Sequence, residues 1–296
     1  MTGVSLCGIE LAHPVINGSG TFDAIAAHRA FGDALLRDFP FSAFVSKTIT
    51  LRPRAGNPPP RLWEAPAGLV NSIGLPNKGL EGYLAEDLPE LARLPVPLIT
   101  NVMGSSAAEL AALVEAVDAP AAIDAIELNV SCPNVKTGLD IGADPRELEA
   151  VVANMRPLTR KPLIVKLTPN TADVAAVARA AEGAGADAVS LINTLRAYAP
   201  HPRAPGEPWL GGGTGGLSGP AIRAVALAQV RAVTGRVAIP VIGMGGIQAG
   251  RHAAEFLDAG ATAVAVGTET FRDPTAGRRI ANELGDLYAK SGNIGG

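Results

Sequence analysis

Polar side chains follow short apolar stretches at several places along this 296-residue chain. They are Lys47, Thr48, Asn101, Asn129, Lys166, Asn193 and Thr194. Lysines, amides and hydroxyls suit a ligand that has many hydrogen-bond donors and acceptors and some negative charge. Since this set holds no carboxylate and no histidine, it is a poor site for a divalent metal or for the carboxylate pair of a glycosidase.

Glycines form a second group of interest near the C-terminal end of the chain. They lie in Gly243–Gly246 and at Gly267, which precedes Thr268, and Gly219 opens the helix before them. Backbone N–H groups in such loops, beside a helix N-terminus, hold phosphates. A ligand with a phosphate at one end and an amide-like ring at the other is indicated, and flavin mononucleotide (FMN) fits both ends.

The elements that must position these residues are short apolar runs alternating with stretches of helical spacing, which favours parallel strands buried on both faces. We expect strands over 15–17, 43–47, 98–101, 125–129, 163–166, 188–193, 240–243 and 263–267. We expect helices over 81–93, 107–117, 145–155, 172–181, 220–233, 248–257 and 276–288. Eight such units favour an α/β fold of the (β/α)8 TIM-barrel type, with an open doubly wound sheet as the alternative.

Three stretches interrupt this alternation. Residues 5–11 are expected to form a short N-terminal hairpin that closes the bottom of the barrel. Residues 52–78 and 196–216 are rich in proline and glycine and follow the second and sixth strands. We expect them to be loop insertions on the C-terminal face, where barrels build their sites, within a single domain spanning 1–296.

Two matches to the pattern G-x-G-x-x-G/A, 211–216 and 183–188, do not stand between a strand and a helix. A dinucleotide fingerprint needs that context, so we expect no NAD site on this chain. The formal net charge of −3 argues against nucleic acid or an anionic membrane as a partner. The chain has neither a membrane-length apolar run nor a basic leader, so we expect a cytoplasmic protein.

The two cysteines, Cys7 and Cys132, are too few for a disulfide framework or a metal cluster. Cys7 is expected to be a small packed side chain. Cys132 follows a strand end, precedes Pro133 and is flanked by Asn129 and Asn134, which favours a functional thiol at the mouth.

Lys47 and Lys166 each end an apolar strand. A desolvated lysine forms Schiff bases in barrel aldolases, or it stabilises negative charge on a reduced flavin. The neighbouring amides favour the flavin. An aldolase and a non-catalytic phosphate-binding barrel stay open as alternatives.

A series of motifs resembles the class 1 dihydroorotate dehydrogenases from the N-terminal strand to the last helix. The most specific are Arg54-Ala-Gly-Asn-Pro-Pro-Pro-Arg61 and the Ser131–Asn134 segment of Glu127-Leu-Asn-Val-Ser-Cys-Pro-Asn-Val135. Others are Asn17-Gly-Ser-Gly-Thr-Phe22, Ser46-Lys-Thr48, Asn71-Ser-Ile-Gly-Leu-Pro-Asn77, Asn101-Val-Met-Gly-Ser-Ser106, Val165-Lys-Leu-Thr-Pro-Asn170, Ile192-Asn-Thr194, Gly215-Gly-Leu-Ser-Gly-Pro220, Ile242-Gly-Met-Gly-Gly-Ile247 and Val266-Gly-Thr268.

The resemblance implies an FMN enzyme of pyrimidine biosynthesis that oxidises (S)-dihydroorotate to orotate. By analogy, Cys132 takes the proton from substrate C5 while a hydride leaves C6 for flavin N5, and the loop over 130–142 acts as a lid. A thiol that acts as a base must be partly ionised, so the resemblance implies a lowered pKa for Cys132.

The family's site residues map onto this chain as two sets. The cofactor set is Ser19, Lys47, Thr48, Asn101, Asn129, Lys166 and Ile192 for the ring and ribityl chain, and Gly219, Gly245, Gly246, Gly267 and Thr268 for the phosphate. The substrate set is Lys47, Asn71, Ser72, Ile73, Gly74, Leu75, Asn129, Asn134, Asn193 and Thr194. No metal site is implied.

The motifs are most similar to subtype B, which passes electrons to NAD through a second subunit carrying FAD and an iron–sulfur cluster. The implied assembly is a homodimeric core, extended to a heterotetramer by that subunit. The loop over 195–210 departs from the family's usual sequence. A fumarate-using homodimer is therefore the first alternative, and a related flavin barrel acting on uracil-like rings is another.

Overall fold

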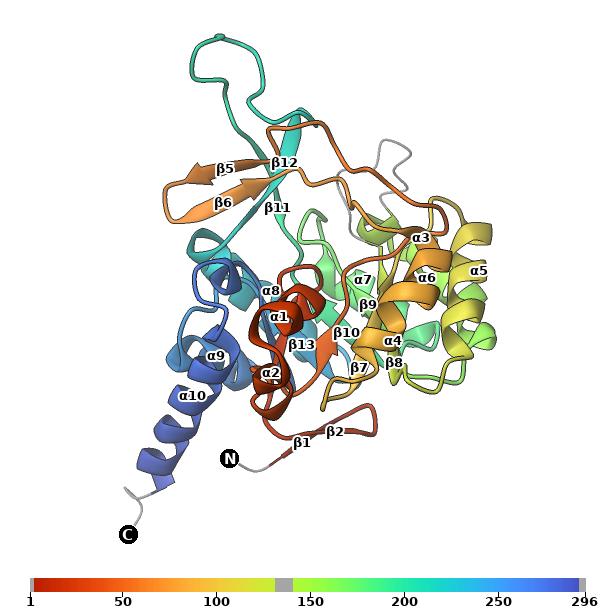
Figure 1. Cartoon of the computed structure of the whole chain (residues 1–296), viewed down its shortest axis with the longest axis vertical. Coiled ribbons are helices and arrows are strands. Elements are labelled where there is room, and N and C mark those ends of the chain that lie inside the picture. Colours follow the sequence, from red (N-terminus) through yellow and green to blue (C-terminus); the bar gives the residue numbers. More distant parts are fainter. Residues whose placement is uncertain (1–2, 131–140, 293–296) are drawn as a thin grey trace.

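The computed structural model describes residues 3–130 and 141–292, and its centre is a sheet of eight parallel strands (Figure 1). In spatial order the strands are β3 (Val15–Asn17), β14 (Ala263–Val266), β13 (Val241–Met244), β10 (Ala188–Leu191), β9 (Leu163–Lys166), β8 (Ala125–Asn129), β7 (Leu98–Val102) and β4 (Phe44–Val45). All eight predicted strands are confirmed, and their parallel order around a nearly closed barrel confirms the (β/α)8 fold.

The barrel closes between β3 and β4 through a side chain. Asn17 is fully buried, its Nδ2 donates to the Val45 carbonyl at 2.8 Å, and its Oδ1 accepts from the Val45 N–H at 2.8 Å. The Asn17 amide thus makes both of the hydrogen bonds that a neighbouring strand would make at this point.

Helices surround the strands, and most of them agree with the predictions. They are α5 (Ala107–Asp118), α6 (Pro145–Met155), α7 (Val174–Gly183), α8 (Arg223–Thr234), α9 (Gly250–Asp258) and α10 (Ala276–Gly292). Side chains of Ser106, Asp144 and Asp173 accept hydrogen bonds from the first-turn N–H groups of α5, α6 and α7. These caps satisfy donors that a helix start leaves open, which fixes where each helix begins.

Two regions differ from the predicted helices. The helix predicted over 81–93 consists of α3 (Gly79–Gly82), a π-helical turn (Tyr83–Asp87) and α4 (Leu88–Leu91). Helical geometry is continuous from Gly79 to Leu91, and the π-helical turn lies just before Pro89, whose missing N–H cannot donate to the carbonyl four residues earlier. The helices α1 (Ala24–Phe31) and α2 (Asp33–Arg37) were not predicted.

A short hairpin, β1 (Val4–Leu6) and β2 (Ile9–Leu11), closes the N-terminal end of the barrel as predicted. Leu6 and Leu11 are buried against the apolar interior of the barrel. Cys7 lies in the hairpin turn, and its thiol donates to the Asp187 carbonyl at 3.2 Å. Burial, followed by the charge of Asp187, raises the pKa of Cys7 to about 11.

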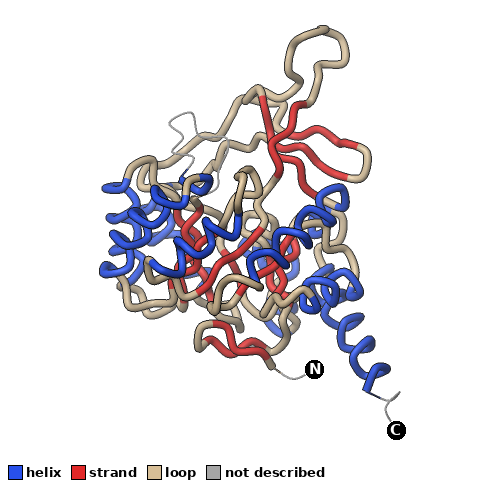
Figure 2. The backbone as a smooth tube through the Cα atoms, turned by 180° about the vertical axis from the view of Figure 1, so that it is seen from behind, coloured by secondary structure: helices blue, strands red, loops and turns tan. Residues whose placement is uncertain are grey.

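A second sheet lies at the opposite end of the barrel from the hairpin (Figures 1 and 2). Its antiparallel strands, in the order β11 (Leu195–Tyr198), β12 (Thr214–Ser218), β6 (Gly68–Asn71) and β5 (Leu62–Ala65), come from the two stretches expected to be loops. That expectation was wrong for these segments, because strands far apart in sequence complete one sheet. The placement of both insertions on the C-terminal face is confirmed.

Within the described residues, no helix is both long and apolar enough to cross a membrane.

Candidate active site

The carboxyl ends of the barrel strands bring several predicted residues together. Asn129 at the end of β8 donates from Nδ2 to the Thr48 hydroxyl at 3.2 Å. The Ser19 hydroxyl lies 3.4 Å from Thr48 Oγ1 and donates to the Ser46 carbonyl at 2.8 Å. Polar side chains that follow β3, β4 and β8 therefore form one connected cluster at the mouth.

Lys166, the last residue of β9, lies in register between Asn129 of β8 and Ser190 of β10. The side chain is buried, with 6% of the residue exposed. Its ammonium makes no hydrogen bond or ion pair with any residue that the structure describes. A buried cation is stable when an anion or strong acceptor faces it, so Lys166 marks a place for such a group on a ligand.

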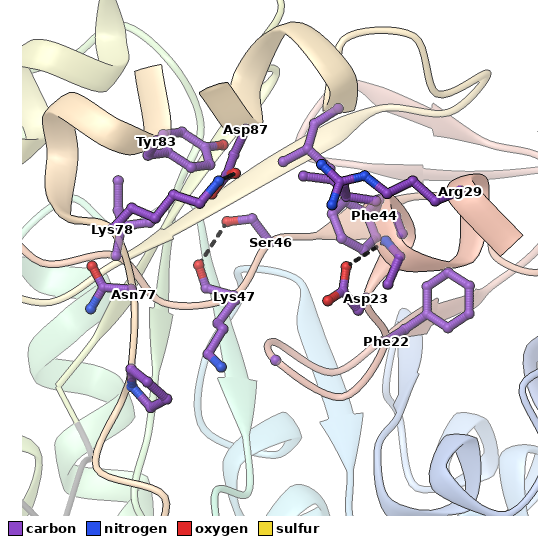
Figure 3. Close-up of a pocket in the computed structure, with 17 residues that line it drawn as sticks. Phe22, Asp23, Arg29, Phe44, Ser46, Lys47, Asn77, Lys78, Tyr83 and Asp87 are labelled. Atoms are coloured by element: carbon purple, nitrogen blue, oxygen red, sulfur yellow. Dashed lines mark hydrogen bonds and ion pairs between the residues drawn. The ribbon is translucent and has the colours of Figure 1, made fainter. Parts of the chain in front are cut away.

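Lys47 has a different environment, because its side chain is exposed. Desolvation by the surrounding walls nevertheless lowers the pKa of Lys47, against the opposing charge of Asp23 and together with the like charge of Arg61. Figure 3 shows its side chain directed away from Tyr83 and Asp87. An accessible ammonium in this position can pair with a carboxylate of a small substrate.

A cavity of about 370 Å³ adjoins this cluster, between α1, the segment after β4 and the α3–α4 region (Figure 3). Gly20, Ser46 and Lys47 line it together with residues outside the predicted site, among them Phe22 and Tyr83. The cavity thus lies beside the strand ends and shares only Lys47 with the predicted cofactor and substrate sets.

The glycines predicted to hold a phosphate also meet. A Cβ placed on Gly246 would lie 2.9 Å from the Gly219 carbonyl, and one on Gly219 would lie 3.6 Å from Thr268 Cγ2. Gly219, Gly245 and Gly246 have φ values of +90°, +133° and +70°. Side chains larger than hydrogen are strained at such angles, and their absence leaves backbone N–H groups open to approach.

The phosphate and ring parts of the cofactor set join at Ile192. Its N–H donates to the Met244 carbonyl at 3.0 Å, and a Cβ on Gly245 would lie 3.4 Å from Ile192 Cγ1. Near the other glycines, a Cβ on Gly267 would lie 3.6 Å from Thr21, and the Thr268 hydroxyl donates to that of Ser218 at 2.8 Å.

The substrate set falls around β6 and β12. Asn71 Nδ2 donates to the Gly216 carbonyl at 3.2 Å, and Thr194 packs against the same glycine. Asn193 Oδ1 accepts from the N–H of Thr194 at 2.9 Å. Asn71 of β6 and Thr194, which directly precedes β11, therefore lie against Gly216, and Asn193 adjoins Thr194.

The residues from Ser72 to Leu75 are shaped by Asn57. Its Nδ2 donates to the Ser72 hydroxyl at 3.0 Å, and its N–H donates to the Ile73 carbonyl at 3.0 Å. Ser72 is fully buried, and Gly74 approaches the Asn57 backbone too closely for any Cβ. The Arg54–Arg61 motif thus supports the loop, and its Asn57 fixes the segment from which substrate contacts were predicted.

Cys132 and Asn134 lie outside the described residues, as does most of the loop predicted to act as a lid. The segment before them ends at Val130, whose carbonyl accepts from the N–H of Gly142 at 3.0 Å. The two described ends of this loop therefore meet directly after β8.

Sequence analysis assigned no role to Glu127, although this residue begins one of the family motifs. This side chain lies on β8 two residues before Asn129, it is 2% exposed, and it accepts hydrogen bonds from Asn101 and Ser190. The predicted site contains only the last residue or two of each strand, whereas Glu127 lies two residues before the end of β8, deeper in the barrel. A charged residue in the middle of the apolar run 125–129 was the available signal.

Comparison with known proteins decides the family. A sequence profile described as dihydroorotate dehydrogenase matches residues 1–288. The chain belongs to the dihydroorotate dehydrogenase family. The dihydroorotate dehydrogenase B (NAD(+)) catalytic subunit of Desulforudis audaxviator is 45% identical over 292 residues, covering 98% of this chain and 94% of the relative. The protein of the same name from Pelobacter propionicus is 47% identical over 282 residues, covering 95% and 91%.

A third relative, from Solibacter usitatus, carries a provisional name as a dihydroorotate dehydrogenase A (fumarate). It is 44% identical over 289 residues, covering 97% of this chain and 93% of the relative. These findings confirm the predicted resemblance to the class 1 enzymes, most like subtype B. The chain is a flavin-dependent oxidoreductase of pyrimidine biosynthesis, and a Schiff-base aldolase is excluded by its family.

Proposed function

We propose that this chain is the FMN-carrying catalytic component of a dihydroorotate dehydrogenase that passes electrons through a partner subunit to NAD. The observation that carries the FMN assignment is the buried Lys166 ammonium with no described protein partner, next to the Asn129–Thr48–Ser19 cluster. Such a cation suits an anionic or strongly accepting edge of a ring.

The phosphate end of FMN has its own support. Gly219, Gly246 and Thr268 lie against one another at positions where a Cβ would be strained or crowded. With Gly245 and Gly267 they present backbone at the end of the barrel where phosphates bind in this fold. The ring and ribityl chain would meet Ser19, Lys47, Thr48, Asn101, Asn129, Lys166 and Ile192.

FMN supplies the two-electron acceptor for the oxidation. The protein's part is to hold the substrate and remove its proton. Lys47 would pair with the substrate carboxylate, and Asn71, Asn193 and Thr194 would offer donors and acceptors to the ring amides. Ser72–Leu75, Asn129 and Asn134 complete the proposed contacts.

Cys132 is the proposed base for the C5 proton. Its support is the Ser131–Asn134 motif, which begins two residues after Asn129 in the sequence. A thiolate is needed for this task, so the proposal includes a pKa for Cys132 below that of an ordinary cysteine.

The partner assignment rests on the relatives named as catalytic subunits and on the glycine runs of this chain. Residues 211–216 run into the antiparallel strand β12, and 183–188 run from α7 into β10. Neither has the strand–turn–helix order of a dinucleotide fingerprint. We therefore propose that FAD, an iron–sulfur cluster and NAD belong to a separate subunit, around a homodimeric core in the cytoplasm. The fumarate-named relative keeps a fumarate-using homodimer as the second candidate.

The test is an anaerobic titration of the FMN-loaded protein with dihydroorotate, in which the absorbance of the flavin is measured after each addition. We expect stoichiometric bleaching, then reoxidation by NAD only when the partner subunit is present. Reoxidation by fumarate alone would replace the partner assignment with the homodimer. A protein that binds FMN but is not bleached would refute the proposed reaction.

A further inference from the structure

Glu127 is a buried acid that the proposed reaction does not use. It lies in the interior of the barrel, on the same face of β8 as Ala125 and Asn129, since residues two apart in a strand share a face. Oε1 accepts from Asn101 Nδ2 at 2.5 Å, and Oε2 accepts from the Ser190 hydroxyl at 2.7 Å. The three side chains come from β7, β8 and β10, so they form a polar layer across the barrel.

The carboxylate determines which way the Asn101 amide faces. Asn101 Nδ2 donates to Glu127 Oε1, so Asn101 turns its NH2 group toward the carboxyl oxygen. The planar amide then directs Oδ1 away from Glu127. This oxygen is fully buried and has no hydrogen-bond donor among the described residues. A buried acceptor without a partner is costly, so it points to a donor on a bound molecule.

We propose that Glu127 is a positioning residue that fixes the Asn101 amide with its oxygen free, so that Asn101 selects a ring N–H of the flavin. The inference rests on the proposed FMN site. The oxidised isoalloxazine has a single ring N–H, at N3, and this is the donor that a fixed Oδ1 acceptor selects. The Ser190 hydroxyl donates to the other oxygen, Oε2, and is therefore a second, separate partner of Glu127.

The geometry explains why a carboxylate stands here and not an amide. A glutamine presents one acceptor and one donor, so it can pair with either end of the Asn101 amide. The Ser190 hydroxyl accepts as readily as it donates, and it would tolerate both arrangements. Glu127→Gln therefore keeps the size of the side chain and its contacts. It allows the Asn101 amide to adopt either of its two orientations.

The experiment compares the affinities of the apoprotein for FMN and for 3-methyl-FMN, which lacks the ring N–H. We expect the wild-type protein to bind FMN at least about tenfold more tightly, as loss of one hydrogen bond to a buried acceptor implies. Asn101→Ala should bind both flavins alike. Glu127→Gln should reduce the preference to about threefold or less, because an amide that can turn over accepts the methylated ring more readily.

Ser190→Ala is the matched control, since it removes the other partner of Glu127 and leaves the Glu127–Asn101 contact. It should keep the tenfold preference. Circular dichroism and thermal melting of each apoprotein report folding independently of flavin.

Three results would overturn the proposal while FMN binding by the wild-type protein still stands. They are equal affinity of the wild-type protein for both flavins, an unchanged preference in Glu127→Gln, and a Glu127→Gln protein that does not fold, which would make Glu127 structural. Failure of the wild-type apoprotein to bind FMN would instead refute the proposed function.

Discussion

Replacement of Lys166 by methionine tests whether its charge serves the ligand or the fold. Methionine keeps the unbranched apolar stem and removes the ammonium. In the structure this ammonium is buried and contacts no partner in the described part of the chain, so the apoprotein bears its desolvation cost without an ion pair. Replacing even a buried ion pair with apolar residues of similar volume is often neutral or stabilising by about 1–4 kcal/mol, and a buried charge without a partner has no attraction to offset its desolvation.

We therefore expect the free energy of unfolding of the Lys166→Met apoprotein to exceed that of the wild-type apoprotein by at least about 1 kcal/mol. We also expect this variant to bind FMN more weakly than wild type. A hydrogen bond to a charged group contributes about 2 kcal/mol, which corresponds to roughly 30-fold in affinity. Urea denaturation of the apoprotein and fluorescence titration with FMN measure the two effects.

Lys161→Met is the control with the same chemistry and the opposite expectation. Lys161 Nζ donates to the Ile123 carbonyl at 2.6 Å and to that of Pro120 at 3.1 Å. Its loss should destabilise the apoprotein by about 1–3 kcal/mol and leave FMN affinity unchanged. If Lys166→Met also destabilised the apoprotein, or bound FMN as tightly as wild type, the reasoning about Lys166 would be wrong.

Four further predictions address other parts of the chain. Cys132→Ala should keep FMN bound and slow its reduction by dihydroorotate in anaerobic stopped-flow, and unchanged kinetics would remove Cys132 from the role of base. Asn17→Ala should lower the free energy of unfolding, measured in urea, by about 2–4 kcal/mol, because the buried N–H and carbonyl of Val45 lose their side-chain partner. A decrease of only about 0–1 kcal/mol would show that Asn17 does not close the barrel. Cys7, with its pKa raised to about 11, should react with iodoacetamide in Cys132→Ala protein more slowly than free cysteine at neutral pH, and its rate should climb until the pH passes that value. Gly246→Ala should weaken FMN binding, because Gly246 has a φ of +70° and a Cβ there would lie too close to its neighbours. Gly206→Ala is the control, since Gly206 also has a positive φ, +88°, but a Cβ there would meet nothing within 4 Å, and FMN binding should not change.

The barrel was predictable from the sequence because its signals are local. Each strand is a short apolar run, and α5, α6 and α7 each begin after a residue whose side chain caps the helix. Residues 145–155 show this most clearly, since the predicted and observed bounds of α6 coincide and Asp144 accepts from the N–H groups of Arg146 and Glu147. Such signals depend only on neighbours in sequence.

The second sheet was not predictable in the same way. Its strand β12 reads Thr-Gly-Gly-Leu-Ser, which has low strand propensity, and its Gly216 pairs with Asn71, far away in the chain. Only the tertiary pairing makes this segment a strand. The location of Asn71 and Thr194 around Gly216 follows from that pairing, so their proximity also lay beyond the sequence.

The inward faces of the strands show why the polar layer around Glu127 can exist inside an otherwise apolar barrel. Toward the hairpin, the interior is an apolar cluster that includes Leu6, Leu11, Ile99 and Ile164. Moving two residues along β7 and β8 from Ile99 and Ala125 reaches Asn101 and Glu127. Because parallel strands are paired on both edges, their backbone groups are satisfied within the sheet, and the side chains of this layer are left to bond with one another.

Among the residues that the structure describes, two groups close to the mouth have no hydrogen-bond partner: the Asn101 side-chain oxygen and the Lys166 ammonium. One is an acceptor and the other a donor with a charge, so a single planar ring that carries both an N–H and an electron-rich edge would satisfy both. Filling only one of them would leave the other buried at a cost of about 1–3 kcal/mol. The pair therefore favours an amide-bearing ring such as isoalloxazine over a simple phosphate or a sugar, which links the composition of the interior to the choice of cofactor.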